Sequence, residues 1–232
     1  MRVALVVPAA GLGLRLGAGD PKALRLMGGQ TILERAVRGA VDSGVLDVVV
    51  VVVPAEHLTY VRDLLGPLAG TLTFDVVAGG QLRQDSVRAG LQAVPADVDT
   101  VLVHDAARCL APPELFIRVL AAVRAGADAV VPAQPVTDTI KQVDGDVVVG
   151  TPDRADLVAV QTPQGFRRTA LEAAHQALQR VGGPVTDDAR AVELAGGQVR
   201  TVPGEVLALK ITTPLDLVVA EAIVNDAERS SR

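Results

Sequence analysis

Six consecutive valines at positions 48–53 constrain the fold of this chain more than any other stretch. A strand with one side in water alternates apolar and polar residues, whereas this run has no polar position on either face. Strands buried on both faces belong to parallel sheets that are covered by helices above and below. The run therefore predicts an α/β fold around a mostly parallel sheet.

The segments on either side of the valine run alternate between strand and helix patterns. The helix at 31–44 has the clearest limits, because Thr31 and Glu34 form a capping box and Gly44 ends the apolar periodicity. Further strands are expected at 2–7, 72–77, 100–104, 127–132 and near 198–209, and further helices at 55–65, 85–94, 113–125, 167–181, 186–194 and from 213 onward. Repeated β-α-β units with short loops predict a doubly wound, Rossmann-like sheet.

The alternation breaks at residues 135–157, where TIKQV and VVVG flank the turn-forming pair Asp144-Gly145. This pattern predicts an antiparallel β-hairpin. A hairpin that leaves the sheet must bury its apolar side chains elsewhere, and a second subunit is the simplest partner. We therefore expect one domain over residues 1–232, with a protruding β-hairpin arm at about 135–157 that forms a homodimer.

The composition excludes several classes of protein. A net charge of −5, three Phe, one Tyr and no Trp argue against a nucleic-acid-binding surface. No segment approaches the ~20 apolar residues of a membrane span. The single cysteine, Cys109, cannot form an intrachain disulfide, is interpreted as a small buried residue, and suggests a reducing compartment. We expect a cytoplasmic protein that binds neither nucleic acid nor membranes.

A glycine-rich loop, PAAGLGLRLGAGDPK at residues 8–22, follows the first expected strand, where α/β folds bind nucleotides. The dinucleotide fingerprint fails because Leu16 stands where the third glycine belongs. A P-loop fails because Lys22 lies between Pro21 and Ala23. The loop nevertheless carries two cations, Arg15 and Lys22, which suit a polyphosphate.

The loop and several later blocks carry a family resemblance. Pro-Ala-Ala-Gly-x-Gly-x-Arg followed by Pro-Lys is similar to nucleotidyltransferases that activate sugar or polyol phosphates. The later blocks are GG at 79–80, DSV at 85–87, VHDAAR at 103–108, DTIK at 138–141, QTPQ at 161–164, TD at 186–187 and LKIT at 209–212. In this order, over nearly the whole chain, they resemble the 2-C-methyl-D-erythritol 4-phosphate cytidylyltransferase family.

The resemblance implies transfer of a cytidylyl group from CTP to 2-C-methyl-D-erythritol 4-phosphate. The products would be 4-diphosphocytidyl-2-C-methyl-D-erythritol and pyrophosphate. The cofactor would be Mg²⁺. The substrate phosphate is already an anionic nucleophile, so the protein must align it with the α-phosphorus of CTP and neutralise the departing pyrophosphate. Arg15 and Lys22 suit the second task.

The resemblance also implies a set of site residues. Arg15 and Lys22 would stabilise the transition state, while Arg154 and Lys210 would position the polyol phosphate for attack. The nucleotide would contact Pro8, Ala9, Ala10, Gly11, Gly13, Gly80, Gln81, Asp85, Ser86, Asp105 and Lys210. The polyol phosphate would contact Asp105, Arg108, Thr139, Arg154, Thr162 and Thr186. Because Thr139 and Arg154 flank the arm, they are candidates to serve the neighbouring subunit's site.

Asp105 follows the expected strand VLVHD, at the carboxyl edge where open α/β sheets bind ligands. A carboxylate there suits Mg²⁺ that bridges protein and phosphates, although a helix-capping aspartate would look the same in sequence. The resemblance favours the metal.

Two alternatives remain open. A ribitol 5-phosphate cytidylyltransferase shares these blocks and differs in the polyol pocket. A nucleotide-binding regulator without catalysis is the second, although the joint presence of Arg15, Lys22, Asp105 and Lys210 favours an enzyme. Gln81 stands where related sequences often have an acid, so base contacts there are less defined than the phosphate contacts.

Overall fold

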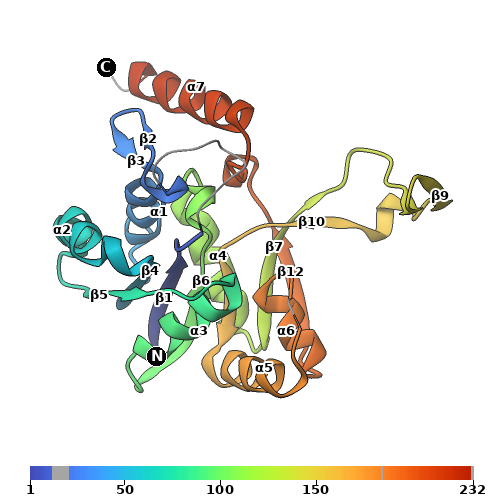
Figure 1. The fold of residues 1–232 in the computed structure, drawn as a ribbon, viewed down its shortest axis with the longest axis horizontal. Helices are drawn as coiled ribbons and strands as arrows, with labels where there is room; N and C mark the ends of the chain where they lie inside the picture. Colours follow the sequence, from blue (N-terminus) through green and yellow to red (C-terminus); the bar gives the residue numbers. More distant parts are fainter. Residues whose placement is uncertain (12–20, 184, 231–232) are drawn as a thin grey trace.

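The computed structural model describes residues 1–11, 21–183 and 185–230 of the chain. Its centre is a sheet whose strands are β1 (Arg2–Pro8), β4 (Val48–Val53), β5 (Thr73–Ala78), β6 (Val98–Val103), β7 (Ala129–Pro135), β10 (Val158–Val160), β11 (Gln164–Arg167) and β12 (Val199–Pro203). The order is β10-β7-β11-β6-β1-β4-β5, and β12 also pairs with β7 (Figure 1). Only β10 and β11 run antiparallel to their neighbours among these described strands. The prediction of a mostly parallel sheet is confirmed.

Helices cover both faces of the sheet, as the valine run predicted. One face packs against α1 (Ile32–Val41), α2 (Leu58–Ala69), α4 (Pro113–Arg124) and part of α7 (Pro214–Ser230), and the other against α3 (Arg83–Ala93), α5 (Arg168–Val181) and α6 (Asp188–Leu194). Within β4, Val49 and Val51 belong to the first apolar cluster, while Val50 and Val52 belong to the second. The doubly wound arrangement is therefore confirmed.

The expected limits of the first helix are close to those observed. The Thr31 hydroxyl accepts a hydrogen bond from the Glu34 backbone N–H at 3.0 Å, and the Glu34 carboxylate accepts one from the Thr31 backbone N–H at 2.8 Å. Gly44 follows the helix with a φ of +67°, a conformation that favours glycine. Local sequence chemistry therefore marks both ends of α1.

The expected strand near 198–209 is wrong in its second half. The ladder ends with β12, and residues Val206–Ala208 form a short 3-10 turn. The Gln161 side chain replaces the ladder, because its carbonyl accepts from the Glu205 N–H at 2.9 Å and its amide donates to the Glu205 carbonyl at 2.8 Å. This contact joins residues 44 positions apart, so the sequence near Glu205 carries no local pattern that predicts it.

Among the described residues, four short strands were not expected from the sequence. Strands β10 and β11 lie on either side of the cis peptide bond between Thr162 and Pro163. A small hairpin joins β2 (Leu26–Met27) and β3 (Gln30–Thr31) ahead of α1.

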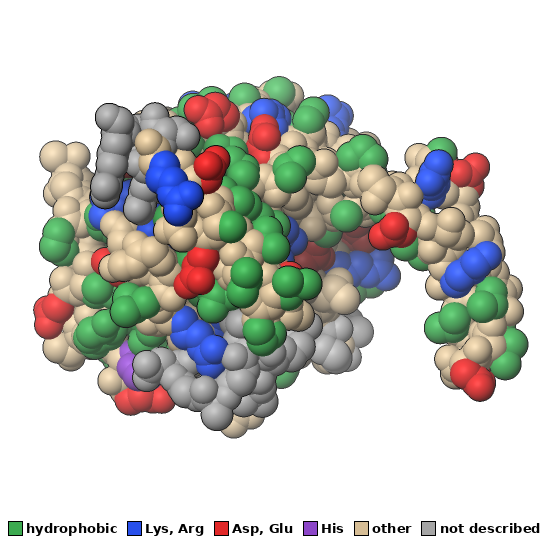
Figure 2. Space-filling model, turned by 90° about the horizontal axis from the view of Figure 1, so that it is seen from above, with side chains coloured by type: hydrophobic (Ala, Val, Ile, Leu, Met, Phe, Trp, Pro, Cys, Tyr) green, Lys and Arg blue, Asp and Glu red, His purple; other side chains and the backbone are tan. Residues whose placement is uncertain are grey.

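The predicted arm is present and leaves the body of the molecule (Figure 1). Its hairpin consists of β8 (Gln142–Asp144) and β9 (Val147–Gly150), and Gly145 in the turn has a φ of +60°. Hydrophobic side chains gather on the projecting arm (Figure 2). Val147, Val148 and Val149 are all more than half exposed. Among the described residues, no helix has the length and apolar character needed to cross a membrane.

Candidate active site

A pocket of about 260 Å³ lies at the carboxyl ends of β1, β5 and β6. Its lining residues are Pro8, Ala9, Ala10 and Gly11 after β1, Gly80, Gln81, Leu82, Arg83 and Ser86 after β5, Asp105, Ala106 and Ala107 after β6, together with Lys22, Ala23 and Lys210. Open α/β sheets bind ligands at this edge, because the strand ends and the following helices leave a crevice there.

The backbone segments around this pocket approach one another closely at Gly79. A Cβ added to Gly79 would lie 2.5 Å from the Ala10 Cβ and 2.8 Å from the Ser86 hydroxyl. The backbone N–H of Gly79 donates to the Val53 carbonyl at 2.8 Å. Only glycine fits this contact, which therefore sets the relative position of the loop after β1 and the start of α3.

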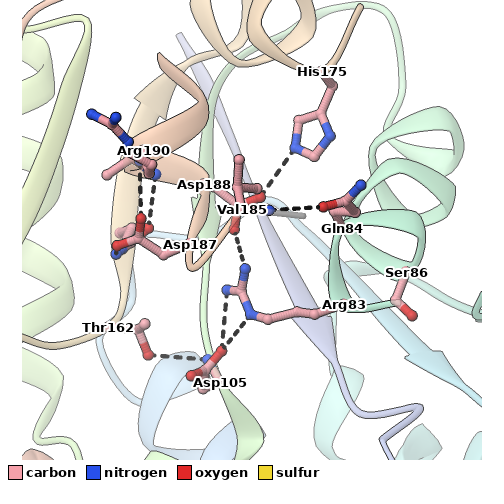
Figure 3. Close-up of polar contacts among 12 residues, drawn as sticks. Arg83, Gln84, Ser86, Asp105, Thr162, His175, Val185, Asp187, Asp188 and Arg190 are labelled. Atoms are coloured by element: carbon pink, nitrogen blue, oxygen red, sulfur yellow. Dashed lines mark hydrogen bonds and ion pairs between the residues drawn. The ribbon is translucent and has the colours of Figure 1, made fainter. Parts of the chain in front are cut away.

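Asp105 lies between two cations. Its Oδ2 accepts a hydrogen bond from Lys210 Nζ at 2.7 Å, and its Oδ1 lies 3.1 Å from both Nε and Nη2 of Arg83. Its backbone N–H donates to the Thr162 hydroxyl at 3.0 Å (Figure 3). Burial opposes ionisation of the carboxyl, but Arg83 and Lys210 outweigh it and hold the Asp105 pKa below its usual value. Asp105 is therefore an ionised carboxylate in a fixed orientation.

Sequence reasoning missed Arg83. It is the first residue of α3, where a cation is unfavourable because the helix dipole places partial positive charge there. A cation at such a position, three residues after the Gly79-Gly80 pair, indicates a tertiary partner. The structure supplies two, Asp105 and Asp188, which together raise the Arg83 pKa despite the opposing effect of burial.

A second pocket of about 170 Å³ adjoins the first. It is lined by Arg83, Asp105, Arg108, Val160, Gln161, Thr162, Gln164, Thr186, Asp187 and Lys210. Arg83, Asp105 and Lys210 belong to both linings, so the two hollows meet at these charged groups. Two ligands could thus occupy neighbouring spaces with their phosphates on either side of one carboxylate.

Most of the site residues expected from sequence lie in these two pockets. The first contains Pro8, Ala9, Ala10, Gly11, Lys22, Gly80, Gln81, Ser86, Asp105 and Lys210, and the second contains Asp105, Arg108, Thr162, Thr186 and Lys210. Arg108 is oriented by hydrogen bonds from Nη1 to the Ala208 carbonyl at 2.6 Å and from Nη2 to the Val160 carbonyl at 3.1 Å. Gly13 and Arg15 lie outside the described residues.

Of the expected residues that the structure describes, three do not line either pocket in a single chain. The Asp85 carboxylate accepts from the Leu82 N–H at 3.4 Å and pairs with Arg88 at 3.0 Å, at the start of α3. Thr139 and Arg154 lie on and beside the arm, and Arg154 donates to the Thr137 carbonyl at 3.0 Å.

His104 and Cys109 are buried residues with a structural role. His104 is fully buried, its Nδ1 lies 3.0 Å from the Thr162 hydroxyl, and its ring meets Phe116 edge-on at 4.9 Å between centroids. Burial lowers the His104 pKa to about 4, so the imidazole is neutral at pH 7. Burial raises the Cys109 pKa to about 12, which keeps this thiol unreactive.

Comparison with known proteins identifies the family. Residues 3–226 match the family model described as "IspD: 2-C-methyl-D-erythritol 4-phosphate cytidylyltransferase". Proteins of that name from Rhodococcus jostii and Streptomyces avermitilis are 54% and 50% identical to this chain. The first alignment covers 97% of this chain and 96% of the relative, and the second covers 96% and 92%.

Solved structures agree with the sequence matches. A 2-C-methyl-D-erythritol 4-phosphate cytidylyltransferase from Thermus thermophilus is 35% identical, with a TM-score of 0.78 over 97% of this chain and 100% of that one. A 4-diphosphocytidyl-2C-methyl-D-erythritol synthase from Anaerococcus prevotii is 29% identical, with a TM-score of 0.85 over 97% and 98%. This chain therefore belongs to the 2-C-methyl-D-erythritol 4-phosphate cytidylyltransferase family.

Proposed function

We propose that this cytidylyltransferase binds CTP in the first pocket and 2-C-methyl-D-erythritol 4-phosphate in the second, and joins them by in-line attack on the CTP α-phosphorus. The observation that carries this assignment is the meeting of the two pockets at Asp105, Lys210 and Arg83. Reaction geometry requires the attacking phosphate and the α-phosphorus to approach within a few ångströms, and adjoining pockets with shared walls meet that requirement.

The protein's task in this reaction is positioning and charge neutralisation. The nucleophile is a phosphate oxygen, so no residue has to remove a proton from it. We assign Arg15 and Lys22 to the charge that develops on the departing pyrophosphate, and Lys210 and Arg154 to the position of the attacking phosphate. Preorganised cations are effective here because they need not reorient as charge develops.

Magnesium fits the donor set as a cation held jointly by protein and substrate. Among the described residues, no group of three His, Cys, Asp or Glu side chains is close enough to form an all-protein metal site. Asp105 Oδ1 accepts a hydrogen bond from Arg83 Nε and lies 3.1 Å from Arg83 Nη2, whereas Oδ2, among the described residues, accepts only the hydrogen bond of Lys210 and keeps a lone pair for a cation. Mg²⁺ commonly takes one carboxylate with substrate phosphates and water. When bound, it would neutralise phosphate charge.

The arm is proposed to form a homodimer and to complete the neighbouring site. Ile140, Val143, Val147, Val148 and Val149 are exposed in the single chain, and a projecting element with many exposed apolar side chains is characteristic of protein interfaces. Thr139 and Arg154 would then reach the partner's second pocket. We further propose that residues 1–232 act as one domain, in the cytoplasm.

Mixing two inactive variants tests the exchange of residues between subunits. Arg154→Gln removes an arm cation and Lys210→Met removes a pocket cation. In a mixed dimer, one site would combine an intact Lys210 with the partner's intact Arg154. Random reassociation should therefore restore about one quarter of the wild-type activity. No restoration, although mixed dimers form, would mean that Arg154 serves its own chain or no site.

Pyrophosphate release tests the proposed reaction itself. CTP, UTP, ATP and GTP would each be paired with methylerythritol phosphate and with ribitol 5-phosphate, in the presence of Mg²⁺. Release with CTP and methylerythritol phosphate alone is expected. Release only with ribitol 5-phosphate would move the acceptor assignment to that alcohol, and release with no pair would contradict catalysis.

A further inference from the structure

A buried acid lies behind the candidate active site. Asp188, in α6, is fully buried, and both of its carboxylate oxygens have partners from other helices. Oδ1 lies 3.0 Å from Nε2 of His175 in α5, and Oδ2 accepts from Nη1 of Arg83 in α3 at 2.7 Å (Figure 3). Neither Asp188 nor His175 lines a pocket that holds a proposed substrate.

This acid is ionised where it lies. Burial opposes its charge, but the His175 hydrogen bond and the Arg83 charge outweigh that effect and lower the Asp188 pKa. An ionised carboxylate only accepts hydrogen bonds, so the His175 Nε2 carries the proton that it shares with Asp188. Burying a charge of this kind without partners would be strongly unfavourable, so its two partners are required.

Arg83 connects the buried acid to the reaction centre. Its guanidinium contacts Asp188 through Nη1 and Asp105 through Nε and Nη2. Contacts on two edges of one planar group fix its orientation, which the single ammonium of a lysine could not reproduce. The chain of contacts therefore runs from His175 through Asp188 and Arg83 to Asp105.

We propose that Asp188 and His175 are positioning residues, which hold Arg83 in the orientation that fixes the Asp105 carboxylate between the two pockets. This inference rests on the proposed function. Without Asp188, Arg83 keeps its charge but loses the contact on the side opposite Asp105. Because Arg83 lines both pockets, its guanidinium would then be free to turn toward a ligand. A guanidinium free to turn toward substrate phosphates would leave Asp105 and disturb the alignment of the reacting groups.

The two His175 variants give the sharpest test. His175→Gln retains an amide N–H that can reach Asp188, whereas His175→Leu removes the donor. Asp188→Asn removes the charge, and Arg83→Lys keeps a charge without the planar fork. Arg190→Gln is the matched control, because Arg190 also lies on α6 but forms an exposed pair with Glu193 at 2.8 Å.

The readouts are kcat, the KM of each substrate and the unfolding temperature, with rates measured well below the lowest unfolding temperature. Misplacement of reacting groups by about 1 Å can cost up to 10²-fold in rate. We expect kcat to fall about ten- to a hundredfold in Asp188→Asn, Arg83→Lys and His175→Leu. His175→Gln should recover most of the loss, and Arg190→Gln should match the wild type.

The outcomes are distinguishable. A wild-type kcat in Asp188→Asn and His175→Leu, even with a lower unfolding temperature, would overturn the inference, since these residues would then only stabilise the fold. Equal losses of kcat in His175→Leu and His175→Gln would also overturn the inference. If Asp188→Asn does not fold, the comparison of the two His175 variants tests the inference on its own. An inactive wild-type enzyme would instead contradict the proposed function.

Discussion

Lys210→Met separates the catalytic from the structural role of the cation beside Asp105. The substitution keeps most of the apolar stem and removes a charge that lies 2.7 Å from Asp105 Oδ2. The Lys210 side chain is 42% exposed, so solvent screens the pair and its loss should cost no more than about 1 kcal/mol of stability. Arg83 would still pair with Asp105 at 3.1 Å and keep the carboxylate ionised.

The expected effect on the reaction is much larger. In the proposed reaction Lys210 positions the attacking phosphate, and misplacement of reacting groups by about 1 Å can cost about 10²-fold in rate. For a chain of this size, 1 kcal/mol corresponds to about 2–4 °C in unfolding temperature. Lys210→Met should therefore lose about a hundredfold in kcat/KM while it unfolds within about 4 °C of the wild type.

Pyrophosphate release and calorimetry measure both quantities on the same sample. Arg62→Gln is the control, because Arg62 forms an exposed ion pair with Asp75 at 3.7 Å and lies outside the lining of both pockets. It should leave both quantities unchanged. A loss below tenfold in Lys210→Met, or a drop in unfolding temperature large enough to explain the lost activity, would refute the reasoning.

Three further predictions concern packing and titration. Gly79→Ala should destabilise the protein by about 1–3 kcal/mol in urea unfolding and weaken CTP binding in calorimetry, because the new Cβ would lie 2.5 Å from the Ala10 Cβ. Gly66→Ala is the control, since a Cβ there meets open space and should cause neither effect. The His104 pKa is about 4 in the folded protein, whereas an unfolded histidine has a pKa near 6.5. Between pH 6.5 and pH 4 only the unfolded state binds this proton, so falling pH should remove up to about 3 kcal/mol of stability. Urea unfolding across this range checks the slope, which His104→Gln should flatten. Cys109, with a pKa of about 12, should resist iodoacetamide at pH 8 until the protein is unfolded.

Much of the fold follows from local sequence patterns. The valine run at 48–53 predicts a strand buried on both faces, and the capping box at Thr31 and Glu34 marks where α1 begins. The Asp144-Gly145 turn predicts the hairpin of the arm. Each of these signals comes from neighbouring residues that must satisfy one local geometry, so a single sequence suffices to find them.

Features set by distant contacts could not be found in this way. The end of β12 depends on the Gln161 side chain, which is 44 positions from its backbone partner. The pairing of Arg83 with Asp188 joins residues 105 positions apart. The loop motif and the end of the strand before Asp105 indicated where a ligand binds, and the family resemblance supplied most of the pocket residues, but Arg83 was missed because only the folded chain brings its two acids to it.

Transfer of the α-phosphate of CTP is the most direct measurement of the proposed chemistry. CTP labelled with ³²P at the α-position would be incubated with methylerythritol phosphate, Mg²⁺ and the protein, and the products separated. If the polyol phosphate attacks the α-phosphorus, all transferred label appears in the cytidine-diphosphate alcohol and none in pyrophosphate. Label that remains in CTP, or appears only in CMP or CDP, would contradict the proposed attack.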